Sequence, residues 1–256
     1  INGTNHRLNT ILSRTNWSKN YFKNKLILEC GCGAGPDTEI LLGLGARVLS
    51  VDIAGLEVAH DNIGINKNSQ LLQASLLDLP LKTDFFDIVF CHRVLQHTPN
   101  PPQVLRGILK FIKPNGNVFI HSYSNSFFQL MRWKYFLRPF TTRMDPEKLY
   151  LKIKNSSAFY FKLTNSLMKA GKIGKAIDHF FIPFLNYRHV PEFSRKDDDW
   201  IIEYGVHDTF DALSPKYDQP ISKSKLRKIA DEALLSKIVD YEIFQNRSIT
   251  LLRGKE

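Results

Sequence analysis

The chain has 256 residues, of which 43% are hydrophobic, and its formal net charge is +10. No apolar run approaches the roughly eighteen residues that a helix needs to cross a bilayer, so the composition excludes a membrane-spanning helix and fits a soluble globular core. The charge is uneven, because residues 123–200 hold fourteen Lys and Arg against seven Asp and Glu. Such a segment could attract phosphorylated substrates, nucleic acid or an anionic membrane surface. It is equally typical of a basic exterior that contacts only water.

Short strands and helices alternate in the first half of the chain. After a lead-in helix expected at residues 5–14, apolar strand patterns occur at residues 26–29, 47–51, 70–74, 86–91 and 117–122. Helical patterns separate them at residues 37–44, 56–65 and 103–111. This alternation predicts a parallel sheet with helices on both faces, which is a doubly wound, Rossmann-like α/β fold.

The pattern changes over residues 123–203, which we expect to form an inserted, mainly helical cap. Basic and aromatic residues recur at helical spacing in residues 127–137 and 158–168. A connection of this length needs helices of its own in a compact protein. The expected domains are therefore residues 1–122 with 204–256, and the cap.

An aromatic stripe in the cap has two interpretations. It suits the core of the cap. If exposed, it suits a membrane surface or a lipid-like acceptor, because basic residues accompany it. The stripe comprises Phe127, Phe128, Trp133, Tyr135 and Phe136, and the basic residues are Arg132, Lys134 and Arg138.

The end of the chain predicts a helix followed by a hairpin. Residues 222–235 have apolar side chains on one helical side and lysines on the other. Residues 238–244 and 248–252 read as strands joined by a short turn that includes Asn246, and such a turn gives an antiparallel pair.

The three cysteines, Cys30, Cys32 and Cys91, lie in or beside apolar strands and are odd in number. This pattern suits a reducing compartment better than a disulfide framework, so we expect a cytoplasmic protein. What precedes Ile1 is left open.

The first two strands end in residues that predict a nucleotide-binding loop. Gly31, Gly33 and Gly35 follow residues 26–29, and glycine lets the backbone turn tightly and approach a ligand closely. Asp52 ends the second strand nineteen residues after Gly33, where a carboxylate accepts hydrogen bonds from both hydroxyls of a ribose. The spacing predicts a bound adenosine cofactor.

The rest of the loop favours a cofactor with a cationic amino acid end over a dinucleotide. The dinucleotide fingerprint has its third glycine one position after Gly35, and Pro36 fits a pyrophosphate-binding helix start poorly. Glu29 would repel a pyrophosphate, whereas it could attract an ammonium group or hold loop amides in place. A nicotinamide-dependent oxidoreductase is the outlying alternative.

These residues resemble the first motif of the class I S-adenosylmethionine-dependent methyltransferases. The motifs that follow at the right intervals are similar to the type 11 branch of that family: Asp78-Leu79-Pro80-Leu81, Phe85-Phe86-Asp87-Ile88-Val89-Phe90, Val94-Leu95-Gln96-His97 and Leu109-Lys110-Phe111-Ile112-Lys113-Pro114-Asn115-Gly116. The resemblance is strong over residues 20–122, returns over residues 237–253 and is weak over residues 124–203. It implies a seven-stranded sheet of order 3-2-1-4-5-7-6 with the last strand antiparallel, and S-adenosyl-L-methionine as cofactor.

Ligands of open parallel sheets bind beyond the carboxyl ends of the strands, where the strand order reverses. The resemblance places the adenine near the residues after the third strand and the methyl-bearing sulfonium near the end of the fourth. The residues expected to bind the cofactor are Glu29, Gly31, Cys32, Gly33, Gly35, Asp52, Ile53, Ser75, Leu76, Cys91 and His92. The family commonly has Asp where this chain has Ser75, so we expect a somewhat weaker affinity for the cofactor.

Methyl transfer from a sulfonium mainly requires alignment of the reacting atoms, so no strong catalytic signature is expected. A base helps when the acceptor is a hydroxyl or a protonated amine. His97 is the first candidate base because imidazole titrates near neutrality, and its alternative role is to order its loop with Thr98. Residues 206–218, interpreted as a loop, supply His207, Asp208 and Tyr217, which either contact the acceptor or tie the cap to the sheet.

Other chemistries lack their signatures. The Asn/Asp-Pro-Pro-Tyr loop used on amide and adenine nitrogens is absent where Cys91-His92-Arg93-Val94 stands, and Phe90 rather than Pro precedes Cys91. The spacing of the cysteines and His92 matches no usual zinc pattern, so no metal is expected.

The sequence therefore predicts a methyltransferase that acts on oxygen or nitrogen of a small-molecule acceptor of sugar, lipid-linked or natural-product type. The basic cap leaves RNA methylation as an alternative, although no dedicated RNA module is present and nucleic acid is not the expected partner. A partner protein that binds the cofactor without catalysis is a third hypothesis, because Ser75 departs from the pattern and no base is obvious. Peripheral membrane contact through the cap, the acceptor and the oligomeric state are left open.

Overall fold

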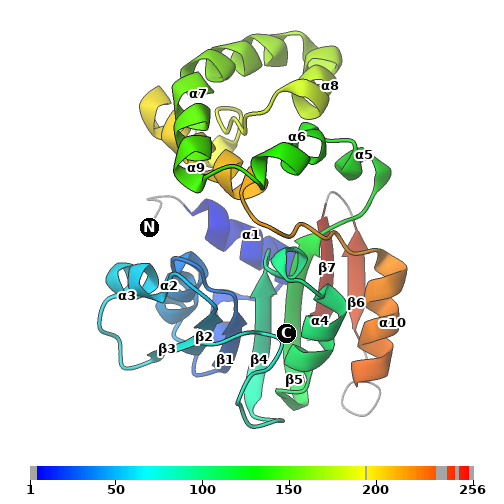
Figure 1. Ribbon diagram of the computed structural model, residues 1–256. Coiled ribbons are helices and arrows are strands. Elements are labelled where there is room, and N and C mark those ends of the chain that lie inside the picture. Colours follow the sequence, from blue (N-terminus) through cyan, green and yellow to red (C-terminus); the bar gives the residue numbers. More distant parts are fainter. Residues whose placement is uncertain (1–4, 194, 235–240, 246–247, 254–256) are drawn as a thin grey trace. The chain divides into compact units, whose positions relative to one another are not determined.

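The computed structural model describes residues 5–193, 195–234, 241–245 and 248–253. The chain separates into two compact units (Figure 1). The first comprises Ile1–Asn125 and Tyr217–Glu256, and the second comprises Ser126–Lys216. None of the helices in the described ranges is long and apolar enough to cross a membrane.

A seven-stranded sheet forms the centre of the first unit. Its strands are β1 (Leu26–Cys30), β2 (Arg47–Asp52), β3 (Ser69–Gln73), β4 (Phe86–His92), β5 (Ile112–Tyr123), β6 (Glu242–Gln245) and β7 (Ser248–Arg253). Their spatial order is β3-β2-β1-β4-β5-β7-β6. The pairs among β1 to β5 are parallel, and β7 is antiparallel to both β5 and β6. The predicted fold, strand order and antiparallel last strand are confirmed.

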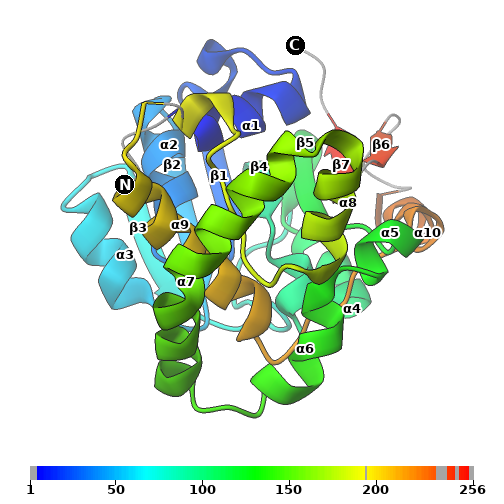
Figure 2. The same ribbon diagram turned by 90° about the horizontal axis from the view of Figure 1, so that it is seen from above.

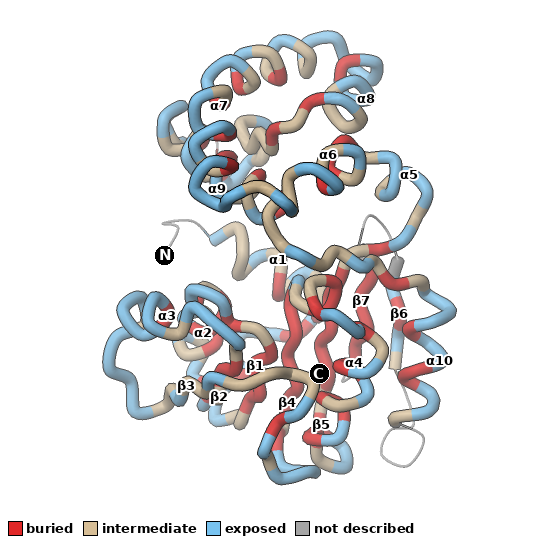
Figure 3. The backbone as a smooth tube through the Cα atoms, in the orientation of Figure 1, coloured by how far each residue is buried: buried red, intermediate tan, exposed pale blue. Residues whose placement is uncertain are grey.

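The sheet is buried on both faces because its central strands are nearly continuous apolar runs. On one face, Val89 and Cys91 belong to a core cluster with α4 (Pro101–Leu109) and α10 (Lys223–Leu234). On the other face, Ile88 and Phe90 belong to a cluster with α1 (His6–Thr15) and α2 (Pro36–Gly43). Figure 3 shows the resulting run of buried positions along β4 and β5. The remaining helix, α3 (Leu56–Ile63), connects β2 to β3.

Two elements of the first unit begin at least two residues earlier than the sequence pattern predicts. At α4, Pro101 and Pro102 occupy the first turn, where no amide hydrogen bond is lost, and Asn100 accepts a hydrogen bond from the Gln103 amide at 3.2 Å. At β5, the register shifts where it pairs with the start of β4, so that the strand already begins at Ile112. The predicted start of β6 at residue 238 and the turn residue Asn246 lie outside the described residues.

The second unit is helical. Its helices are α5 (Phe127–Leu130), α6 (Trp133–Thr141), α7 (Pro146–Lys169), α8 (Gly171–Phe181) and α9 (Asp198–Leu213), with a short 3-10 turn at Pro191–Phe193. Figure 2 shows α7 alongside α8 and α9, and both pairs are in contact. A separate core includes Trp133, Phe161, Phe193 and Ile201. The helix predicted over residues 127–137 is divided into α5 and α6, and the one predicted over residues 158–168 lies inside the longer α7.

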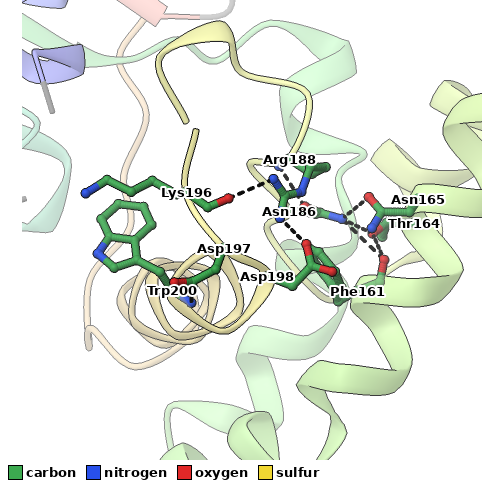
Figure 4. Close-up of polar contacts among 9 residues, drawn as sticks. All are labelled: Phe161, Thr164, Asn165, Asn186, Arg188, Lys196, Asp197, Asp198 and Trp200. Atoms are coloured by element: carbon green, nitrogen blue, oxygen red, sulfur yellow. Dashed lines mark hydrogen bonds and ion pairs between the residues drawn. The ribbon is translucent and has the colours of Figure 1, made fainter. Parts of the chain in front are cut away.

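Side-chain hydrogen bonds hold the non-helical segment after α8 to its neighbours (Figure 4). The Asn186 amide nitrogen donates to Thr164 Oγ1 at 2.5 Å and to Asn165 Oδ1 at 2.9 Å, both on α7. The Arg188 guanidinium forms an ion pair with Asp198 at the start of α9. These contacts join the segment to two helices of the same unit.

One prediction about this region is wrong. Residues 206–218 were expected to form a loop, but α9 continues to Leu213, so the first eight of them are helical. Val206, Thr209 and Ala212 are buried at helical spacing, which explains why the helix continues to Leu213, two residues before Pro215. The second unit accordingly runs to Lys216, thirteen residues beyond the boundary expected from the sequence.

Candidate functional site

The glycine loop turns sharply between β1 and α2. Gly31, Gly33 and Gly35 have φ angles of 83°, 51° and 85°, a region that side chains rarely adopt. A Cβ at Gly31 would lie 2.4 Å from the methyl groups of Val94, and one at Gly35 would lie 2.9 Å from Ile63 Cδ1. A Cβ at Gly33 would meet no atom within 4 Å. Packing therefore requires glycine at the two ends of the loop, whereas its middle borders open space.

Asp52, the last residue of β2, holds this loop. Its Oδ2 accepts a hydrogen bond from the Gly33 amide at 2.8 Å, and its Oδ1 accepts from the Ile53 amide at 2.7 Å. On the other side of the loop, Asn62 of α3 donates to the Ala34 carbonyl at 2.9 Å. Asp52 Oδ1 also accepts from the Ala54 amide at 3.3 Å. A carboxylate has about four acceptor positions, so Asp52 keeps capacity for a ligand hydroxyl while it orients the loop. The ligand role expected of Asp52 stays a prediction, and the sequence did not indicate the contacts of Asp52 and Asn62 with the loop.

Glu29 lies beneath the loop. It is 2% exposed, and its Oε2 accepts hydrogen bonds from Thr38 Oγ1 and Ser50 Oγ, both at 2.6 Å. Burial and the nearby charge of Asp37 raise the pKa of Glu29 to about 7. The hydrogen bonds of Glu29 with hydroxyl groups thus join β1 to α2 and β2, and the Glu29 carboxyl titrates near neutrality.

The residues after β3 form a turn. Ser75 Oγ accepts a hydrogen bond from the Leu77 amide at 3.3 Å, and the Ser75 carbonyl accepts one from the Asp78 amide at 3.2 Å. Leu76 is half-buried against the core cluster that contains α4. Both residues therefore stand at the carboxyl edge of the sheet, where the strand order predicts the site.

The end of β4 contains a buried polar contact that the sequence did not predict. His92 Nδ1 lies 2.9 Å from Asp37 Oδ2, and the His92 side chain is only 1% exposed. Asp37 Oδ1 lies 3.3 Å from Arg7 Nε of α1. The arrangement links α1, α2 and β4 behind the glycine loop. The sequence gives a weak indication of Asp37, because it is an acid in the first turn of a helix, and it gives no indication that Arg7 takes part in this contact.

Their surroundings leave Asp37 ionised and His92 neutral. Burial alone would raise the pKa of Asp37, but the neighbouring His92 and Arg7 lower it to about 2. Burial lowers the pKa of His92 in spite of the carboxylate beside it. A neutral imidazole that donates from Nδ1 leaves Nε2 as an acceptor, and this atom is buried without a hydrogen-bond partner among the described residues.

A second buried histidine lies beside the first. His121 of β5 is paired with His92 in the sheet register, and their ring centroids are 5.3 Å apart. Its Nδ1 lies 2.8 Å from Thr250 Oγ1 of β7. Burial and the neighbouring His92 lower the pKa of His121 to about 2, so it is neutral under ordinary conditions.

Beyond β4, His97 ends the short 3-10 helix Leu95–His97 and contacts the returning chain. His97 Nδ1 lies 3.0 Å from the Tyr217 carbonyl oxygen. The neighbouring Gln219 amide donates to the Gln96 carbonyl at 2.7 Å, and Ser122 Oγ donates to Gln96 Oε1 at 2.8 Å. Of the candidate catalytic residues, His97 and Tyr217 therefore lie together, joined through the backbone of Tyr217.

The other two candidates of residues 206–218 belong to the second unit. His207 is exposed on α9, with its ring 5.6 Å from that of Tyr150. Asp208 accepts a hydrogen bond from the Tyr187 hydroxyl. The structure thus does not bring His207 or Asp208 together with His97 inside one unit.

The cysteines are buried thiols. Burial raises the pKa of Cys32 and of Cys91 to about 12, and that of Cys30 well above its usual value. Cys91 lies in the core cluster of the sheet. Within the part of the chain that the structure describes, no group of three His, Cys, Asp or Glu residues is arranged to hold a metal ion.

Comparison with known proteins finds similarity within the first unit. Residues 28–120 match the family model described as a methyltransferase domain. The chain is 31% identical over 116 residues to a ubiquinone biosynthesis O-methyltransferase of Colwellia psychrerythraea, which covers 43% of this chain and 46% of that protein. It is 34% identical over 124 residues to a protein of the same name from Glaesserella parasuis, covering 45% and 52%. The chain spans about half the length of the curated relatives it matches.

Among solved structures, an S-adenosylmethionine-dependent methyltransferase from Mesorhizobium loti aligns with a TM-score of 0.39 and 22% identity. The alignment covers 43% of this chain and 51% of that one.

Proposed function

Because residues 28–120 carry a methyltransferase domain of the class I, type 11 kind, we propose that this chain moves a methyl group from S-adenosyl-L-methionine to an oxygen or nitrogen atom of a small-molecule acceptor. The observation that carries the proposal is the pairing of Gly33 with Asp52. An open backbone position and a carboxylate joined at 2.8 Å form a cradle at the carboxyl ends of β1 and β2.

The residues present fit the cofactor. Asp52 would accept a hydrogen bond from a ribose hydroxyl, and the backbone of Gly31 to Gly35 would pass close to the ligand because no side chain projects from Gly33. Ser75 and Leu76 would flank the adenine. When bound, the cofactor supplies a methyl group on a sulfonium, whose leaving group needs no acid.

The chain's own residues then have to position the acceptor and take its proton. His97 is the proposed base. The Tyr217 carbonyl can only accept a hydrogen bond, so His97 Nδ1 carries the proton in that contact, and a neutral imidazole is then able to accept a proton at Nε2. The backbone contact orients the ring in the manner expected of a general base.

The acceptor class follows from weaker support. The curated relatives are named O-methyltransferases, which favours oxygen over nitrogen. A sugar, lipid-linked or natural-product acceptor fits a methyl transfer that depends mainly on alignment of the reacting atoms. The basic second unit keeps RNA methylation as a second candidate, since fourteen Lys and Arg lie within residues 123–200.

Calorimetry tests the cofactor site. The protein should bind S-adenosylhomocysteine, and Asp52→Ala should weaken binding by roughly a hundredfold or more, since each hydrogen bond to a charged group contributes about 1.5–3 kcal/mol. Asp61→Ala is the matched control, because it removes an exposed carboxylate on α3. Absence of binding, or equal binding by Asp52→Ala and the parent protein, would overturn the proposal.

Turnover separates the enzyme from a binding protein. Release of S-adenosylhomocysteine with a panel of hydroxyl and amine acceptors would support catalysis, whereas a cofactor that binds and is never consumed would favour a non-catalytic partner. Salt-sensitive binding and methylation of RNA would favour the second candidate.

A further inference from the structure

Three helices of the second unit carry large apolar side chains that face solvent. We define the apolar face by its residues: Phe127, Phe128 and Leu130 of α5 with Met131 directly after it, Phe136 and Phe140 of α6, and Ile173, Ile177 and Phe181 of α8. Their exposure is high, reaching 71% at Phe127, 70% at Phe140 and 74% at Ile173. Single exposed apolar residues are ordinary, but a set on neighbouring helices marks an interaction surface.

Helix α8 shows most clearly that large apolar side chains of this unit face solvent. Ile173, Ile177 and Phe181 are spaced by four residues, so they form one stripe along the helix, and all three are exposed. The side toward the rest of the unit carries Gly174, at which an added Cβ would lie 1.7 Å from the Leu167 carbonyl of α7. The helix thus packs closely near its start through a small residue and leaves all three members of its apolar stripe exposed, unlike an ordinary surface helix.

Helix α6 repeats the arrangement. Trp133 and Arg138 are buried, and Arg138 donates to the Ala212 carbonyl at 3.1 Å and to the Pro215 carbonyl at 2.6 Å. Phe136 and Phe140, again four residues apart, are 57% and 70% exposed. Here a basic residue is used to hold the helix in place, while two phenylalanines face water. The aromatic stripe foreseen in the sequence is therefore divided, with Trp133 in the core and the phenylalanines outside.

The three helices lie next to one another. His179 Nε2 of α8 is 3.1 Å from the Phe128 carbonyl oxygen of α5, and α6 is in contact with α8. Figure 2 shows α5 and α6 close to α8. The apolar side chains consequently belong to one region of the second unit.

The charge around this region indicates what it contacts. Residues 126–196 hold fourteen Lys and Arg against four Asp and Glu. Lys172 and Lys175 are exposed on α8 beside Ile173, and Arg143 is exposed after α6. A second copy of the chain would bring two basic surfaces together, which is unfavourable. Apolar side chains among basic ones are the composition of helices that insert into the interface of an anionic bilayer.

We propose that the apolar face docks on the surface of a membrane that contains anionic lipids. The phenylalanines and isoleucines of α5, α6 and α8 enter the boundary between headgroups and acyl chains, and Lys172 and Lys175 contact the lipid headgroups. This surface belongs to the second unit and does not depend on the cofactor site. A lipid-linked acceptor would be presented to an enzyme held in this way.

Sedimentation with vesicles tests the proposal on the full chain. The protein should bind vesicles of phosphatidylcholine with about a third phosphatidylglycerol, and bind them more weakly in high salt or without the anionic lipid. Ile173→Ser and Phe181→Ser should each weaken binding by about tenfold, since burial of such a side chain changes a partition coefficient by one to two orders of magnitude. Lys172→Glu should weaken it by at least about fivefold.

Phe159→Ser is the matched control, because Phe159 is 65% exposed on α7 and lies outside the apolar face. Circular dichroism and S-adenosylhomocysteine binding check that each variant is folded. Asp52→Ala should keep the vesicle binding, so a failure of the proposed cofactor site does not affect this test. Absence of binding to anionic vesicles, an equal loss in Phe159→Ser, or concentration-dependent dimers that Phe181→Ser abolishes without vesicle binding would overturn the proposal.

Discussion

Replacement of the buried Glu29 by Gln should stabilise the protein at pH 8 but not at pH 4. Burial and Asp37 raise the pKa of Glu29 from 4.5 to about 7, so the folded protein holds a proton there that the unfolded chain has already lost. Below pH 4.5 the group is neutral in both states and has no effect. As the pH rises from 4.5 to 7, the free energy of unfolding of the parent protein falls by about 1.4 kcal/mol per pH unit. Above pH 7 the total loss stays at about 3 kcal/mol.

Gln is a suitable replacement because its amide oxygen still accepts from Thr38 and Ser50, which both donate to Glu29 at 2.6 Å. The difference in unfolding free energy between Glu29→Gln and the parent is the quantity to measure, at pH 5, 6, 7 and 8. The pH dependence of the parent protein's unfolding free energy would be misleading on its own, because His121 contributes the opposite trend. Burial lowers the pKa of His121 to about 2, so its contribution to stability is lost as the pH falls below 6.5.

Urea titration followed by the fluorescence of Trp17 is the assay. Trp17 is in the core of the first unit, whereas Trp133 and Trp200 belong to the second, so a background with both of these replaced by Phe reports the unit that contains Glu29. A difference that does not change between pH 5 and 8, or a Glu29→Gln protein that is less stable at pH 8, would show that Glu29 is an ordinary ionised acid.

The remaining predictions concern the loop and its supports. Gly31→Ala should lower stability by about 2 kcal/mol or more, measured by urea unfolding, because its Cβ would meet Val94 at 2.4 Å, and Val94→Ala should restore part of the loss. Gly33→Ala should cost only about 1 kcal/mol of stability, yet weaken S-adenosylhomocysteine binding at least about tenfold by calorimetry, because its Cβ enters the open cradle. Asp37→Ala should destabilise by about 3 kcal/mol, since it removes the buried carboxylate that contacts both His92 and Arg7, and an unchanged melting curve would contradict this. Ser75→Asp should tighten calorimetric binding of S-adenosylhomocysteine several-fold, and equal or weaker affinity would contradict the role given to this position.

The sheet and the loop could be predicted from the sequence because local patterns determine them. Apolar runs such as residues 88–90 are long enough to show that β4 is buried on both faces, and glycine is needed wherever φ is positive and space is short, as at Gly31. Asp52 is found by its distance from Gly33 along the chain. Such signals require no knowledge of which distant element lies next to them.

The second unit shows where local patterns fail. The polar residues of 206–213 look like a functional loop, but their buried members repeat at helical spacing and form the end of α9. The exposure of Phe136 and Phe140 could not be predicted either, because an apolar stripe at helical spacing looks the same in the sequence whether it faces a core or water. Only packing against α7 and α9 determines which side of a helix is buried.

The side chains that hold the site in place could not be predicted from local patterns, for a related reason. Recognition through the backbone needs particular small residues at fixed spacing, and it therefore leaves a motif in the sequence. Recognition through side chains can use any elements that the fold brings together. Arg7, Asp37 and His92 come from α1, α2 and β4, and His121 meets Thr250 across 129 positions of the chain. The half of the proposed site that would hold a nucleoside is a backbone feature, so the sequence could predict it, whereas residues that select an acceptor are of the second kind and have to be located by mutation.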